Sequence, residues 1–233
     1  MQYKTLIFSL IFIFFGCQQV EINSTKQETL EDDSAPLDLN IQVNIEQPQY
    51  KGIWEYFVSR SIESNNYILD ERVLYYMNIH LKDISKFTEY LNDSFYFFYF
   101  AIDELEKNDL PIELALVPYI ESNYDPFSIS PSGAVGMWQF MPRTGRFYDL
   151  DRTWWNEDRH DPFASTIAAV KYLEYLYKRF DKDIYLTLAA YNAGPSLLDR
   201  KMRQNKRKGN PTDFRSLDLP EQTKDYIPKY IAL

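Results

Sequence analysis

Three short stretches of the chain contain the residue types that acid–base chemistry requires. They read ELALVPYIESNYDP (113–126), SPSGAVGMWQFMP (130–142) and LAAYNAG (188–194). In the first stretch, Glu121 follows Val-Pro-Tyr-Ile, so its carboxyl group begins among apolar side chains. Such a carboxyl group loses hydration, which raises its pKa and keeps it protonated near neutral pH. A protonated carboxyl group can donate to the oxygen of a leaving group, so Glu121 is a candidate general acid.

Helical periodicity is found around these stretches. Residues 67–81 place apolar side chains at helical spacing, and residues 95–107 run from an aromatic cluster into the charged IDELEK. Pro111 is expected at the first position of another helix, where its missing N–H is harmless. Pro118 lies inside that predicted helix and is expected to kink it just before Glu121.

Two further helices are expected to form the core. The helix that follows Asp161-Pro162 has one apolar stripe, which consists of Ile167, Val170, Leu173, Leu176, Tyr177 and Phe180. Asp183 can cap the next helix, which is apolar nearly all round and ends at Gly194. The basic run from Arg200 to Lys208 is expected to be a solvated loop. No strand pattern is comparably strong, so the predicted fold is all-α.

Composition excludes several classes of protein. The chain has 45% hydrophobic and 25% charged residues, which is typical of a globular protein. Its formal net charge of -9 speaks against a nucleic-acid binder. With two histidines and one cysteine, a metal site is not expected, and no phosphate-cradling glycine loop is present. We therefore expect no cofactor, no metal and no nucleic-acid partner.

The N-terminus is predicted to be an export signal. Lys4 precedes an apolar run from Leu6 to Phe15 that is too short to span a bilayer, and Cys17 follows. Residues 1–17 resemble a lipoprotein signal that ends at a lipidated cysteine; an ordinary secretory signal with an incidental cysteine is the alternative. Residues 18–49 are polar and acidic, which predicts a flexible tether, although a partly ordered arm is also compatible. Residues 50–233 form the predicted helical region.

Five blocks in order resemble one known family. They read LPIELALVPYIES, SGAVGMWQFMPRTGR, RHDPFASTIAAVKYL, LAAYNAG and PTDFRSLDLPEQTKDYIPKYIAL, and the similarity around them extends from about residue 96 to residue 233. This part of the chain is similar to the lytic transglycosylases with a soluble-type, goose-lysozyme-like catalytic domain, and within them to the membrane-bound type D group. The resemblance implies a lysozyme-like transglycosylase domain.

The resemblance also implies site residues. Glu121 matches the catalytic glutamate, and the tyrosine of the AYNAG block, Tyr191, is expected to reach toward its carboxyl group. The implied substrate-binding residues are Ser130, Gln139, Met141, Tyr191, Asn192 and Tyr226. Each also has a structural interpretation. Ser130 beside Pro131 is typical of a turn, Tyr191 and Met141 of a core, and Asn192 of a helix end.

The implied reaction needs one carboxyl group. Such an enzyme cleaves the β-1,4 bond between N-acetylmuramic acid and N-acetylglucosamine in peptidoglycan and leaves a 1,6-anhydromuramoyl end. A non-catalytic peptidoglycan-binding lipoprotein and a hydrolytic goose-type lysozyme are the alternatives. We expect a monomer in the cell envelope that faces the periplasm, is attached to the outer membrane through a lipid on Cys17 and acts on peptidoglycan glycan strands.

Overall fold

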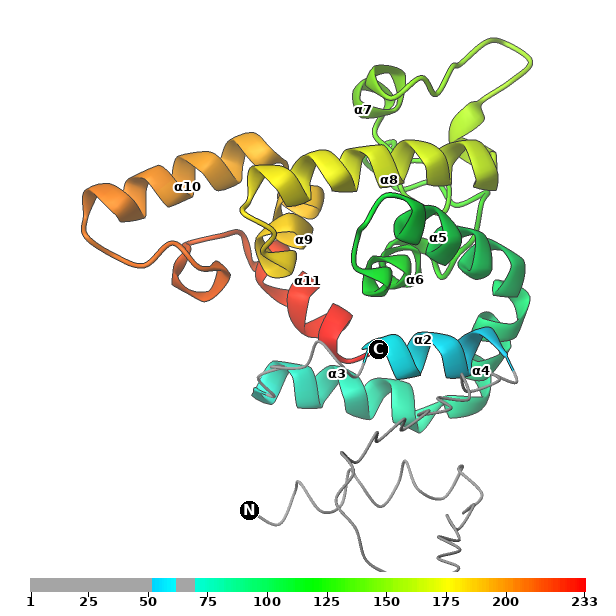
Figure 1. Ribbon diagram of the computed structural model, residues 1–233, viewed down its shortest axis with the longest axis horizontal. Helices are drawn as coiled ribbons and strands as arrows, with labels where there is room; N and C mark the ends of the chain where they lie inside the picture. Colours follow the sequence, from blue (N-terminus) through cyan, green and yellow to red (C-terminus); the bar gives the residue numbers. More distant parts are fainter. Residues whose placement is uncertain (1–51, 62–69) are drawn as a thin grey trace, which may run out of the picture. The chain divides into compact units, whose positions relative to one another are not determined.

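The computed structural model describes residues 52–61 and 70–233. Within these ranges the chain consists of α-helices and short 3-10 helices, and its β-type pairs are isolated bridges (Figure 1). The α-helices are α2 (Ile53–Ser61), α3 (Glu71–Lys82), α4 (Ile84–Asp93), α5 (Phe95–Lys107), α6 (Val117–Ser122), α7 (Pro142–Phe147), α8 (Pro162–Arg179), α9 (Ile184–Ala193), α10 (Pro195–Arg207) and α11 (Glu221–Ile231). The 3-10 helices are η2 (Ile112–Leu116), η3 (Asp158–His160) and η4 (Phe214–Ser216). The predicted all-α fold is confirmed.

Helices α8 and α9 form the centre of the core. The Asp161 carboxylate accepts hydrogen bonds from the backbone N–H groups of Phe163 and Ala164 and so caps α8, as predicted. Asp183 caps α9 in the same way, and α9 ends at Gly194, whose φ is 84°. Helix α8 packs against α5 on one side and α9 on another (Figure 1).

One residue of the predicted α8 stripe lies outside the core. Ile167 is 42% exposed, whereas Val170 and the later apolar residues of the stripe are buried or partly buried. The reason is local, because Trp138 Nε1 donates to Thr166 Oγ1 (2.9 Å) and turns Thr166 inward. Successive residues of an α-helix are rotated by about 100° around the axis, so Ile167 is turned out of the core.

Helices α3 and α5 occur where they were predicted. Helix α5 has the predicted bounds, and α3 begins after Asp70, which caps the N–H groups of Arg72 and Val73. Leu69, which belonged to the predicted apolar pattern of α3, lies outside the described residues. Helix α11, the last helix, packs against α3, α6 and α9. It thereby joins α3 to the centre of the fold.

The predicted kinked helix around Pro118 is wrong. Pro111 caps η2, and a separate short helix, α6, begins at Val117. Pro118 therefore lies in the first turn of α6, where no backbone N–H is needed, and the chain breaks before it instead of kinking. Glu121 is at the C-terminal end of α6, as expected.

The basic run from Arg200 to Lys208 is also not a loop. All but its last residue belong to α10, which buries Leu198 and projects its charged side chains outward. Straight-chain basic residues have good helix propensity, so one buried leucine anchors a helix that is otherwise polar.

The predicted signal peptide with Cys17 and the predicted tether lie outside the described residues. Within the described part, no helix combines the length and the apolar character that crossing a lipid bilayer requires.

Candidate active site

The Glu121 carboxyl group is held by a tyrosine from the other end of the domain. Glu121 is partly buried at the end of α6, and Tyr226 Oη on α11 donates a 2.7 Å hydrogen bond to its Oε1. Burial raises the pKa of Glu121 to about 7, although the Tyr226 hydrogen bond acts to lower it. A group with this pKa is populated in both protonation states near neutral pH. It can therefore give up a proton and later accept one.

The tyrosine that forms a hydrogen bond with the Glu121 carboxyl group is Tyr226, not the expected Tyr191. Tyr191 was expected to reach toward Glu121, but its hydroxyl donates to the carbonyl oxygen of Trp138 at 2.7 Å. Tyr226 makes the contact instead. Burial raises the pKa of both tyrosines well above the usual value, and the charge of Glu121 adds to the effect. Both hydroxyls therefore stay protonated and act as hydrogen-bond donors.

The segment after Glu121 turns sharply away from α6. Ser122 Oγ donates to the carbonyl oxygen of Met137 (2.9 Å) and so links α6 to the loop 130–142. Asn123 and Tyr124 follow in the left-handed region, with φ of 53° and 64°. Left-handed conformations of residues other than glycine are costly and tend to occur at functional sites. Tyr124 Oη donates to the Ala115 carbonyl oxygen (2.6 Å), which holds this turn in place.

The SPSGAVGMWQFMP loop is organised by its own polar groups. Ser130 Oγ accepts a hydrogen bond from the Ala134 N–H and lies 2.9 Å from Ser132 Oγ, which is the arrangement of a turn residue. Gln139 has φ 50°, and its Nε2 donates to the Gly136 carbonyl oxygen at 2.8 Å. Met141 is 43% exposed at the end of the loop.

Asn192 links two helices of the site. Its Oδ1 accepts a hydrogen bond from Thr223 Oγ1 (2.9 Å), so the end of α9 is joined to α11, which carries Tyr226. The sequence-predicted residues Glu121, Tyr191, Asn192 and Tyr226 are thus brought together through α6, α9 and α11. Ser130, Gln139 and Met141 lie in the loop 130–142. The hydrogen bonds given for these residues do not reach Glu121.

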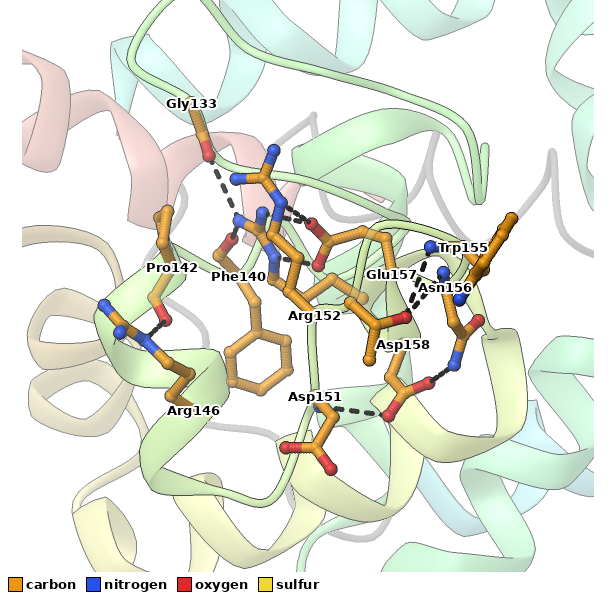
Figure 2. A network of polar contacts seen from close by, with 12 residues as sticks. Gly133, Phe140, Pro142, Arg146, Asp151, Arg152, Trp155, Asn156, Glu157 and Asp158 are labelled. Carbon is orange, nitrogen blue, oxygen red and sulfur yellow. Dashed lines mark hydrogen bonds and ion pairs between the residues drawn. The ribbon is translucent and has the colours of Figure 1, made fainter.

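Several groups that position the site residues lie far from Glu121 in the sequence. The Arg159 side chain is 4% exposed, and its Nη1 donates to the carbonyl oxygens of Gly133 (3.2 Å) and Phe140 (2.8 Å). The Glu157 carboxylate pairs with Arg159. Figure 2 shows Gly133, Phe140 and Glu157 in this network. No sequence pattern marks Thr223 or the backbone carbonyl groups that accept hydrogen bonds from Ser122 and Tyr191. Their roles depend on contacts with residues far away in the sequence.

Among the described residues, no hydrogen bond joins a second carboxyl group to Glu121, whose carboxyl group accepts from Tyr226. Asp125, the nearest acid in sequence, is exposed and accepts a hydrogen bond from the Phe127 N–H (2.8 Å), as expected of a turn. Among the described residues, no three His, Cys, Asp or Glu side chains come together in a way that could hold a metal ion.

Comparison with known proteins gives consistent matches. The profile of the transglycosylase SLT domain matches residues 98–214, half of the chain. Over 137 residues the chain is 43% identical to the membrane-bound lytic murein transglycosylase D of Escherichia coli (strain K12). The matched stretch covers 59% of this chain and 30% of that protein. A putative tributyltin chloride resistance protein of Alteromonas sp. (strain M-1) is 40% identical over 118 residues, which is 51% of this chain and 57% of that protein.

Among solved structures, the 70 kDa soluble lytic transglycosylase SLT70 of Escherichia coli is similar, with a TM-score of 0.48 and 23% sequence identity. The similarity covers 57% of this chain and 22% of that one. The chain thus spans less than a third of the length of the Escherichia coli transglycosylase D that it matches.

Proposed function

We propose that this chain, which belongs to the transglycosylase SLT domain family, is a peptidoglycan lytic transglycosylase. The observation that carries the proposal is the partly buried Glu121, whose pKa is raised to about 7 and whose carboxyl group is held by Tyr226. A carboxyl group in this state can act first as an acid and then as a base. The catalytic domain is proposed to occupy about residues 96–233, within the helical region 50–233.

The reaction proceeds in two proton transfers. Protonated Glu121 gives its proton to the oxygen that links C1 of N-acetylmuramic acid to N-acetylglucosamine, and the C1–O bond breaks. The departing sugar leaves with a free hydroxyl group. The 6-hydroxyl of the muramoyl residue then bonds to C1 and loses its proton to the Glu121 carboxylate. The product is a 1,6-anhydromuramoyl end, no water is consumed, and Glu121 is protonated again.

This mechanism differs from that of most glycosidases, which use two carboxyl groups. The nucleophile is a hydroxyl group of the substrate, held beside C1, so the attack has the entropic advantage of an intramolecular step. The turn position of Asp125 agrees with a single catalytic carboxyl group. The proposed substrate-binding residues are Ser130, Gln139, Met141, Tyr191, Asn192 and Tyr226.

Localisation is part of the proposal. Since a 43% identical relative is named a membrane-bound transglycosylase, we place the protein in the cell envelope. We propose that it is a monomer anchored to the outer membrane through a lipid on Cys17 and that it faces the periplasm.

The nature of the sugar ends tests the reaction. Purified peptidoglycan is digested with the protein, and the products are identified by mass spectrometry. Anhydromuramoyl ends are expected. Reducing ends would make the protein a hydrolytic goose-type lysozyme, and binding to the sacculus without cleavage would make it a peptidoglycan-binding lipoprotein.

Replacement of Tyr226 by phenylalanine is expected to shift the pH dependence. The hydrogen bond from Tyr226 favours the charged form of Glu121 and lowers its pKa, so its loss raises that pKa above about 7. Because the general acid must be protonated, kcat/KM falls as pH rises through this pKa, and in Tyr226→Phe the fall moves to higher pH.

Tyr191→Phe is the matched control for this measurement. Its hydroxyl group donates to Trp138, so its loss is expected to leave the midpoint of the alkaline fall in place, whatever it does to the rate. An alkaline midpoint that moves equally in both variants, or to lower pH in Tyr226→Phe, would refute the assigned contact.

A further inference from the structure

Two of the four tryptophans lie side by side on the surface. Trp154 and Trp155 are each 80% exposed, and their ring centroids are 3.7 Å apart with planes tilted by 50°. Of the other two, Trp138 is fully buried, and the partly buried Trp54 stacks on Phe98 with centroids 4.1 Å apart. Large apolar side chains exposed as a group usually mark a binding surface.

The tryptophan pair is presented by a turn with several internal hydrogen bonds. The Thr153 N–H donates to the Asn156 carbonyl oxygen (2.8 Å), and Thr153 Oγ1 accepts from the Asn156 N–H (3.0 Å). Below the tip, Arg152 and Glu157 form an antiparallel bridge and an ion pair of 3.2 Å. The Asn156 side chain also donates to Asp158. Because these bonds fix the backbone of the turn, binding there requires little further ordering.

The base of this turn is bonded to the loop that contains Gln139 and Met141. Glu157 holds the Arg159 guanidinium through two hydrogen bonds, Nε to Oε1 at 2.7 Å and Nη2 to Oε2 at 2.9 Å. Arg159 in turn donates to two carbonyl oxygens of that loop, as described above. In Figure 2, Arg152 and Glu157 lie between the Trp155 turn and the labelled Gly133 and Phe140.

Helix η3, which directly follows the turn, contacts the segment that leaves Glu121. His160 Nδ1 lies 2.7 Å from the carbonyl oxygen of Pro126, a hydrogen-bonding distance. Next to it, Phe127 is 75% exposed, with its ring centroid 5.9 Å from that of His160. Exposed aromatic groups thus occur both on the segment after Glu121 and on the turn that precedes η3.

The chemistry of the turn favours a saccharide over a membrane surface. Residues 151–158 contain three carboxylates and one guanidinium, so an anionic lipid surface would repel them. Pyranose rings present C–H groups that pack on the flat faces of indole rings, while the polar groups beside them bond to hydroxyls. Asn156 and Asp151 are such polar groups, and both are exposed next to the pair.

We propose that Trp154 and Trp155 form a saccharide-binding platform for the glycan strand beyond the two sugars that flank the scissile bond. This inference rests on the proposed function, since a polymeric glycan extends past those two sugars. The platform holds the strand through indole–sugar contacts, and the Glu157–Arg159 pair keeps the platform in register with the loop that contains Gln139.

The test measures binding without cleavage. The full chain carrying Glu121→Gln is titrated with chito-oligosaccharides, uncharged β-1,4-linked N-acetylglucosamine chains that present the same sugar faces as the glycan strand, while tryptophan emission and acrylamide quenching are followed. Since Trp138 is buried and Trp54 partly buried, changes report mainly on the exposed pair. We expect a blue shift and protection from quenching. Because replacing Trp154 and Trp155 removes these reporters, the Kd of every variant is measured by isothermal titration calorimetry. Adding W154A/W155A is expected to raise the Kd about tenfold or more, equivalent to a loss of about 1.4 kcal/mol or more.

Two further variants make the result specific. W154F/W155F keeps flat faces and is expected to retain binding within about threefold, on the same argument. Tyr96→Ala removes a 78% exposed aromatic ring at the start of α5 and is expected to leave the Kd unchanged. Circular dichroism checks that all variants are folded.

Three outcomes would overturn the inference. They are an equal Kd with and without the tryptophans, no binding of chito-oligosaccharides by the Glu121→Gln chain, and protection from quenching by vesicles of phosphatidylethanolamine and phosphatidylglycerol in place of chito-oligosaccharides. The proposed function is judged separately, by the sugar ends that the chain with intact Glu121 releases from peptidoglycan. Anhydromuramoyl ends together with an unchanged Kd would reject the platform and keep the transglycosylase.

Discussion

Replacement of Glu121 by glutamine is expected to lower kcat for peptidoglycan cleavage by at least about 10³-fold, since one group performs both proton transfers. Glutamine has nearly the same shape and can still accept the Tyr226 hydrogen bond, but it has no proton of suitable acidity to donate. The loss should therefore appear in kcat, with binding to the sacculus retained. Release of anhydromuramoyl products, followed by mass spectrometry, measures the effect.

Asp125→Asn is the matched control. It removes the nearest other carboxyl group, which accepts a hydrogen bond from the Phe127 N–H, and asparagine can make the same turn contact. Activity within a few-fold of the parent is expected. An equal loss of activity in Asp125→Asn would require a two-carboxylate mechanism and would contradict the single catalytic carboxyl group.

Glu121→Gln should also reveal how far the raised pKa of Glu121 lowers the free energy of unfolding. An unfolded glutamate has a pKa of 4.5, and Glu121 in the folded protein has a pKa of about 7. Stability is therefore complete below pH 4.5, falls as pH rises between these values, and stays reduced above pH 7. Glu121→Gln removes this loss, so at pH 9 the variant is expected to be more stable than the parent in urea denaturation.

Features that depend on neighbours in sequence were predictable. Glu121 could be recognised because apolar residues precede it and because the motifs around it resemble those of a known family. Asp161 and Asp183 could be recognised because a cap acts within three residues. The break before Pro118 was harder. A proline inside a helical pattern is compatible with a kink or with a new helix, and the tertiary setting of η2 and α6 decides between them.

Contacts between distant segments could not be derived from spacing. The Tyr226–Glu121 bond joins residues 105 apart, and the Tyr191–Trp138 bond joins residues 53 apart. Both tyrosines lie near the carboxyl group, so which of them donates to it is settled by the packing of α11 against α6 and α9. Local patterns give the identity of the acid, whereas the three-dimensional fold gives its partner.

Of the two glycines in the loop 130–142, Gly136 is the one where the structure leaves less room for a side chain. Its φ is +82°, a conformation that side-chain-bearing residues rarely adopt, and an added Cβ would lie 1.8 Å from the carbonyl oxygen of Arg159. That oxygen belongs to the backbone of a residue whose side chain is itself fixed by Glu157, Gly133 and Phe140. The obstacle therefore cannot be relieved by rotation of a flexible side chain.

Gly136→Ala is accordingly expected to lower the free energy of unfolding by about 3 kcal/mol or more, from backbone strain and overpacking together. Gly133→Ala isolates the first of these contributions, the backbone strain. Gly133 has nearly the same φ, +86°, but nothing lies within 4 Å of an added Cβ, so only about 1–2 kcal/mol of strain is expected. Urea denaturation of the two variants with equal m-values measures the difference.

The comparison decides whether the close approach of Gly136 to Arg159 positions the site. If it does, Gly136→Ala should also reduce cleavage at temperatures where the variant is fully folded, because relief of the clash must move the loop that carries Gln139. Equal destabilisation in the two variants would mean that the loop yields without cost and that Arg159 does not fix it. A larger loss in Gly136→Ala, in stability and in rate, would identify the contact between the loop and η3 as the support of the substrate-binding side of the active site.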